Sequence, residues 1–297
     1  MPHATASDGV RLYYEEAGSG TTVVFVHELA GDYQSWEPQM RFFSRRYRCV
    51  AYNARGYVPS DVPDAASFSQ ERARDDVIAV LDHLRVDQAH VVGLSMGGFA
   101  TLHVGLAYPD RARSLVVAGC GYGAQPGEEE SFRAECDAAA RRFETAGAEA
   151  AMKYAEGPTR IRFQNKDPRG WLAASEAFAN RPLEGVVRTL RGVQMCRPLL
   201  YQLVEQMRRL DVPTLVMTGD EDDPCLEAAI LLKRNIARAG LVVLPRSGHA
   251  INVEEPDAFN AAVADFLAAV DAGRWERRDP RSVAGGILGF TETHKPS

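Results

Sequence analysis

The sequence predicts an α/β fold in which a mostly parallel sheet is flanked by helices and carries a helical cap. Short apolar runs rich in β-branched residues alternate with longer stretches whose apolar residues recur every three or four positions. This alternation stops between residues 121 and 207, where one helical pattern follows another. The chain of 297 residues is long enough for one such domain with an insertion.

Seven segments have the apolar pattern of buried strands. They span residues 10–15, 22–27, 47–52, 89–94, 113–118, 213–218 and 240–244. Four stretches between or after them have the period of helices that cover a sheet, at 69–84, 96–107, 226–239 and 256–272. Strands that alternate with helices in this way favour parallel pairing.

Five further helices are expected in the insertion, at 128–145, 148–155, 170–179, 183–195 and 199–207. Short helices are marginal in water, so they must pack on the sheet domain, and the carboxyl ends of the strands are where such sheets bind ligands. We therefore expect 1–120 and 208–275 to form the core and 121–207 to form the cap. We assign no role to the tail, 276–297.

Composition excludes several classes of function. The chain has 34 basic and 40 acidic residues, a net charge of −6, which disfavours a nucleic-acid partner. It has no apolar run of the roughly eighteen residues that span a membrane, and its first residues lack the pattern of a signal peptide. Five scattered cysteines match neither a disulfide framework nor a metal site. We expect a cytoplasmic protein with a small-molecule partner, which leaves a homo-oligomer open.

Ser95 is the candidate nucleophile. Strand 89–94 runs directly into Gly93-Leu94-Ser95-Met96-Gly97 and then into a helix, which is the context of a nucleophile elbow. The small residues allow a strained turn that exposes the serine hydroxyl, and the helix directs its amino end at any anion formed there.

A serine hydroxyl needs a neighbouring base, and the base needs an orienting acid. Of the seven histidines, only His249 follows a late strand on a loop. The acid should follow another strand before the histidine, and the strand at 213–218 leads into four consecutive carboxylates, Asp220 to Asp223.

Acyl transfer also requires two donors for the developing oxyanion. The Met96 amide supplies one, and we expect the Leu29 amide, on the loop after strand 22–27, to supply the other.

The serine motif, the carboxylates after Gly219 and the segment Ser247-Gly248-His249 together resemble the α/β-hydrolase family. The loop from Asn53 to Ser60 is similar to a further segment of that family. The resemblance implies an eight-stranded sheet with a cap, no cofactor and no metal, and it is greatest for capped esterases and enol-lactonases. It implies Asp222 as the acid, with Asp220 in reserve.

Glu28 departs from the family pattern, because the family usually has glycine directly after the histidine of this loop. A carboxylate beside a developing anion is repulsive unless it is paired or turned away. We expect Glu28 either to point away and pair with a cation or water, or to help choose a substrate or position water.

Charge also differs between the two halves of the insertion. Residues 158–208 have nine basic and four acidic residues, whereas 121–157 have four and eight. The halves could simply pair with each other and with solvent. Alternatively, Arg188 or Arg191 could face the pocket and bind a substrate carboxylate.

These residues predict a serine hydrolase that cleaves a small carboxylic ester or lactone through an acyl-enzyme. A carbon–carbon hydrolase of vinylogous diketones uses the same fold and triad, although the apolar Leu94 before the nucleophile argues against it. A non-catalytic protein that binds a small ligand on the same fold is the third possibility.

Overall fold

An eight-stranded sheet forms the centre of the protein, as predicted. The computed structural model describes residues 1–123 and 126–282. The strands lie in the order β1-β2-β4-β3-β5-β6-β7-β8, and those from β4 to β8 pair in parallel. Their bounds are His3–Thr5, Arg11–Ala17, Thr22–Val26, Arg48–Tyr52, Ala89–Leu94, Ala112–Ala118, Thr214–Gly219 and Ala239–Leu244 for β1 to β8.

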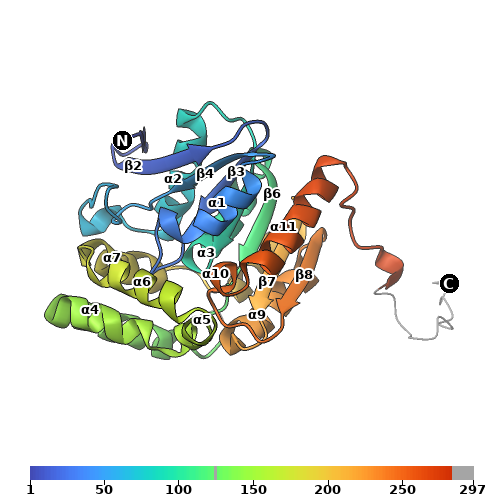
Figure 1. The fold of residues 1–297 in the computed structure, drawn as a ribbon. Coiled ribbons are helices and arrows are strands. Elements are labelled where there is room, and N and C mark those ends of the chain that lie inside the picture. Colours follow the sequence, from blue (N-terminus) through green and yellow to red (C-terminus); the bar gives the residue numbers. More distant parts are fainter. Residues whose placement is uncertain (124–125, 283–297) are drawn as a thin grey trace.

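Helices cover both faces of the sheet (Figure 1). On one face, α1 (Glu37–Phe43), α10 (Ile251–Glu254) and α11 (Pro256–Asp271) pack against side chains of the central strands in one apolar cluster. On the other face, α2 (Gln70–His83), α3 (Met96–Ala107) and α9 (Asp223–Asn235) contribute to a second cluster. Both faces of the central strands are therefore buried, which explains their nearly continuous apolar sequences.

The insertion between β6 and β7 is helical and gathers at one end of the sheet (Figure 1). Its helices are α4 (Glu129–Ala155), α5 (Ile161–Lys166), α6 (Pro168–Ala179), α7 (Glu184–Thr189) and α8 (Val204–Arg209). A third apolar cluster joins Phe143 and Phe178 of the insertion to Leu29, Tyr57 and Met96. These last three residues follow the carboxyl ends of β3, β4 and β5, so the insertion covers that end of the sheet. The proposed domain boundaries stay a prediction.

Several elements differ from the sequence-based expectation. The helices expected at 128–145 and 148–155 are the two parts of α4, which Gly147 interrupts with φ 50°. The helix expected at 183–195 is α7 followed by a π-helical turn at Leu190–Gln194. The patterns missed β1, α1, α5 and α10, which have three to seven residues. Elements this short do not show a period.

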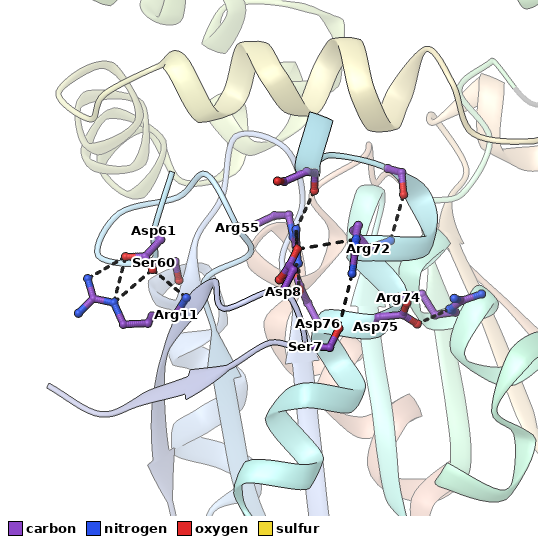
Figure 2. Close-up of polar contacts among 12 residues, drawn as sticks. Ser7, Asp8, Arg11, Arg55, Ser60, Asp61, Arg72, Arg74, Asp75 and Asp76 are labelled. Carbon is purple, nitrogen blue, oxygen red and sulfur yellow. Dashed lines mark hydrogen bonds and ion pairs between the residues drawn. The ribbon is translucent and has the colours of Figure 1, made fainter. Parts of the chain in front are cut away.

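A buried ion cluster anchors the loop after β4 (Figure 2). Arg55 forms a bidentate pair with Asp76 of α2, with N–O distances of 2.6 and 2.8 Å, and its third nitrogen lies 2.8 Å from an Asp8 oxygen. The side chains of Arg55 and Asp76 are 4% and 1% exposed. Because this loop continues into Tyr57, the cluster helps to fix a residue that contacts the candidate site.

None of the helices in residues 1–123 and 126–282 is long and apolar enough to cross a membrane. All five cysteines are free thiols, and four of them are buried. Of the predicted tail, residues 283–297 lie outside the described residues.

Candidate active site

Ser95 lies in a strained turn between β5 and α3. Its φ of 54° and ψ of −116° fall in a region that residues with a side chain rarely adopt. The Ser95 amide donates to the Ala118 carbonyl at 2.8 Å, which ties the turn to the end of β6. Ser95 thereby lies at the carboxyl end of β5, directly before the first turn of α3.

Glycine is required on both sides of this serine because backbone segments approach closely. A Cβ on Gly97 would lie 2.0 Å from the Val26 carbonyl oxygen at the end of β3. A Cβ on Gly93 would lie 2.1 Å from the Gly97 carbonyl oxygen. The sequence motif therefore reflects close packing of β3, β5 and α3 around Ser95.

His249 and Asp222 form a buried pair next to this turn. The His249 Nδ1 atom lies 2.8 Å from the Asp222 Oδ2 atom, and the residues are 4% and 2% exposed. Burial alone would raise the pKa of Asp222, but the adjacent His249 ring holds that pKa below its usual range. Asp220, the reserve candidate, accepts a hydrogen bond from the Ser247 amide instead. The structure therefore joins Asp222, and not Asp220, to the imidazole.

The segment after β6 lies next to both the imidazole ring of His249 and the turn at Ser95. A Cβ built on Gly119 would lie 3.3 Å from the His249 Cε1 atom, while the preceding Ala118 accepts the Ser95 amide. The Tyr122 ring packs edge-on against the His249 ring, with centroids 5.1 Å apart and an interplanar angle of 85°. With Nδ1 bonded to Asp222, the Nε2 atom of His249 has no hydrogen-bond partner among the described residues.

The loop after β3 is held by several hydrogen bonds. The Tyr57 hydroxyl donates to the Leu29 carbonyl at 2.9 Å, and the Gly31 amide donates to the Glu28 carbonyl at 3.1 Å. Among the hydrogen bonds of the described residues, neither the Leu29 amide nor the Met96 amide has an acceptor. Because Leu29 and Met96 belong to the same buried cluster, the two predicted oxyanion donors lie in one region of the site.

Glu28 is buried and paired with a cation of the insertion. Its Oε2 atom lies 2.6 Å from Nη2 of Arg160, in a 3₁₀ turn at Pro158–Arg160, and accepts the Ala30 amide at 2.9 Å. Burial would raise the pKa of Glu28, but Arg160 and the Ala30 amide hold that pKa below its usual range. Glu28 therefore stays a carboxylate, and its charge is directed at Arg160.

A cavity of about 450 Å³ lies between the sheet and the insertion at this point. Its walls include Glu28, Leu94 and Ala250, which are direct neighbours in sequence of Leu29, Ser95 and His249. The opposite wall comes from the insertion and includes Arg160, Phe163, Trp171, Phe178 and Arg181. Leu29, Ser95 and His249 are not themselves in this lining, so the cavity lies beside the candidate site. We call it the substrate cavity, because it is the space in which we expect a substrate.

Arg188 and Arg191 do not line the substrate cavity. Arg188 donates to the carbonyls of Val62 and Pro63 and pairs with Glu184. Arg191 pairs with Glu144 at 2.5 Å. Both border a different cavity of about 760 Å³ between α4 and α7, whose described lining contains none of Glu28, Leu94 and Ala250. A role for either arginine in substrate binding stays a prediction.

Comparison with known proteins identifies the family. A sequence model described as the alpha/beta hydrolase family matches residues 23–262. The chain therefore belongs to the alpha/beta hydrolase family.

Individual relatives cover most of the chain. The 3-oxoadipate enol-lactonase 2 of Acinetobacter baylyi is 30% identical, and the match covers 87% of this chain and 93% of that protein. A putative carbamate hydrolase of a Caulobacter species is 28% identical over 86% of this chain and 96% of its own. The solved structure of Est816, an N-acyl homoserine lactone degrading enzyme, has a TM-score of 0.68 and 27% identity over 89% of this chain and 100% of that chain.

Sequence reasoning missed several residues at the site. Arg160 and Arg181 are two of nine basic residues in 158–208, and nothing in their local sequence distinguishes them. Tyr57 and Tyr122 are single aromatic residues in loops. Their contacts with Leu29 and His249 depend on how distant segments pack.

Proposed function

We propose that this protein hydrolyses a small carboxylic ester or lactone through a covalent acyl-enzyme on Ser95. The observation that carries the proposal is the buried His249–Asp222 pair, 2.8 Å apart, beside a serine in a strained turn. A buried ion pair and a strained backbone conformation each cost free energy of folding, and here the two occur together next to a cavity under the insertion.

In the first step, Nε2 of His249 accepts the Ser95 hydroxyl proton while the serine oxygen attacks the substrate carbonyl carbon. Asp222 holds the imidazole through Nδ1 and stabilises the imidazolium that forms. The tetrahedral oxyanion accepts hydrogen bonds from the amides of Met96 and Leu29, and α3 adds the partial positive charge of its amino end. The imidazolium then protonates the leaving oxygen.

In the second step, water attacks the acyl-enzyme and His249 takes its proton. Collapse of this second tetrahedral intermediate releases the acid and returns the proton to Ser95. Lactone opening follows the same sequence, with the alcohol remaining attached to the acid. The names of two relatives refer to lactones, which supports a carbonyl carbon as the point of attack.

The test combines turnover with labelling of the nucleophile. Wild-type protein should hydrolyse p-nitrophenyl acetate and butyrate, and Ser95→Ala should lose that activity by a factor of about 10⁴ or more. A fluorophosphonate should add one label, which peptide mass spectrometry assigns to Ser95. Ser131→Ala, which removes a serine at the start of α4, is the matched control and should leave both results unchanged.

Two outcomes would replace the proposal. Cleavage of a vinylogous 1,5-diketone, followed by its ultraviolet absorbance and faster than any ester or lactone, would make the protein a carbon–carbon hydrolase. No turnover by wild type or Ser95→Ala and no label, with tight retention of a small ligand, would make it a binding protein.

A further inference from the structure

The insertion places two arginines on the substrate cavity, and an acid of the loop after β3 neutralises each of them. Arg160 lies 2.6 Å from Glu28, and Arg181 lies 2.9 Å from Asp32. All four side chains are at most 17% exposed. Neither cation therefore presents an uncompensated charge to a molecule in the cavity.

The Glu28 carboxylate is held so that it cannot readily turn away from Arg160. The same oxygen that meets the guanidinium accepts the Ala30 amide of its own loop at 2.9 Å. Arg160 is 6% exposed, so solvent does little to screen the pair. Breaking the pair would leave a buried charge without a partner, which strongly opposes such a rearrangement.

The rest of the cavity wall favours uncharged groups. Phe163, Trp171, Phe178 and Val253 supply apolar surface, and the remaining charged residue, Asp167, is an acid. Glu28 compensates the charge of Arg160, although neither terminal nitrogen of Arg160 has a hydrogen-bond acceptor among the described residues. A carboxylate entering this space would lose its hydration and approach Glu28, and the cation that it meets is already paired with an acid. An alkyl, ether or capped ester group loses little on entry and gains apolar contact.

We propose that Glu28 determines the specificity of this site: by neutralising Arg160, it makes the substrate cavity accept an uncharged part of the ester or lactone and reject a carboxylate. This inference rests on the proposed function. It also gives a reason for the carboxylate at a position where the family resemblance leads one to expect glycine. With glycine there, Arg160 would face the cavity as a free guanidinium, which binds carboxylates well.

Two pairs of esters test the wild-type protein at pH 8, and within each pair a methyl ester is compared with the free carboxylate. The first pair, p-nitrophenyl methyl adipate and mono-p-nitrophenyl adipate, places the charge on the acyl side. The second, the butyrate esters of methyl 4-hydroxybenzoate and of 4-hydroxybenzoate, places it on the alcohol side. Each kcat/KM is divided by the rate of alkaline hydrolysis. At least one pair should show a preference of about tenfold or more for the neutral ester.

The variant Glu28→Gln removes the neutralising charge and keeps the side-chain shape. In the pair that showed the preference, it should raise the anionic-to-neutral ratio of kcat/KM by about tenfold or more, because Arg160 becomes free to bind the carboxylate. A purely structural role for Glu28 would lower both rates together and leave the ratio unchanged. Glu28→Gln/Arg160→Gln, which removes both charges, should restore the preference for the neutral ester.

The matched control is Glu144→Gln, which removes the shorter of the two ion pairs of Arg191 in the other cavity and leaves the pair with Asp137. It should leave both ratios within about threefold of wild type. A rise in the ratio with Glu144→Gln and not with Glu28→Gln would overturn the proposal and assign carboxylate binding to Arg191.

The wild-type ratios of kcat/KM for the neutral and anionic esters test the inference even if Glu28→Gln does not fold. Equal kcat/KM values for the two esters in both pairs overturn the inference and leave the proposed hydrolase intact. A failure to hydrolyse any of the four esters, or any other ester or lactone, overturns the proposed function itself.

Discussion

Adding one methyl group at Gly97 should increase the distance between the Met96 and Leu29 amides, the two proposed oxyanion donors. In Gly97→Ala, the new Cβ would lie 2.0 Å from the Val26 oxygen, 2.5 Å from the Val26 carbonyl carbon and 2.8 Å from the His27 oxygen. All three atoms belong to the backbone, so no side-chain rotation relieves the overlap. Restoring an ordinary contact requires the end of β3 and the start of α3 to move apart by more than about 1 Å.

That movement acts directly on catalysis. Met96 immediately precedes Gly97, and Leu29 lies two residues beyond His27, so the two amides shift with the two segments. A misplacement of about 1 Å can cost about 10²-fold, and the loss of one oxyanion donor costs about 10² to 10³ in kcat. We therefore expect the kcat of Gly97→Ala on p-nitrophenyl butyrate to fall by at least about 100-fold.

Gly105→Ala is the control in the same helix. Its Cβ would meet the Leu115 Cδ1 atom at 2.3 Å, which is the end of a side chain that can change rotamer. Both variants gain the same helix propensity, about 1 kcal/mol. We expect the kcat of Gly105→Ala to stay within about threefold of wild type. Circular dichroism and urea unfolding verify that both variants are folded during the assay. A folded Gly97→Ala protein with a kcat near that of wild type would refute the packing argument.

Two further predictions concern stability. Arg55→Met should lower the free energy of unfolding, measured in urea, by about 3 to 5 kcal/mol, because it leaves Asp76 buried without its partner. Arg11→Met, which breaks the exposed pair with Asp61, should lower it far less. Equal losses in the two variants would contradict this prediction. Burial lowers the pKa of His103 to about 4 from 6.5, so the folded state binds fewer protons between these values and stability falls as pH falls through them. From pH 7.5 to 5, His103 should account for about 2 kcal/mol of lost stability. His103→Leu should remove that part of the pH dependence. If the free energies of unfolding of variant and wild type changed in parallel with pH, the assignment to His103 would be wrong.

Much of the fold follows from local pattern. The seven strands expected from apolar runs all occur, with bounds that differ from prediction by no more than a few residues. The strained turn at Ser95 also follows, because the alternation of glycine and larger residues between a strand and a helix has few structural solutions. The missing elements are short ones, and the breaks within the insertion helices reflect single backbone angles such as that of Gly147.

The candidate site shows where local pattern stops being sufficient. Four consecutive carboxylates follow β7, and their residue types alone do not distinguish them. The choice depends on the direction in which each side chain leaves the turn, and this direction brings Asp222 to His249 and Asp220 to the Ser247 amide. The family resemblance had indicated Asp222 by its spacing.

The succession of strands and helices along the chain, the tight turn at Ser95 and the loop position of His249 could be predicted from local pattern, because each depends on residues within a few positions of one another. Which cation faces Glu28 could not be predicted in this way. Sequence reasoning had considered Arg188 and Arg191, yet these pair within the insertion and with nearby loops, while Arg160 reaches the loop after β3. An ion pair between distant segments depends on where folding places the two side chains, and the residues adjacent in sequence to Glu28 or to Arg160 do not determine this.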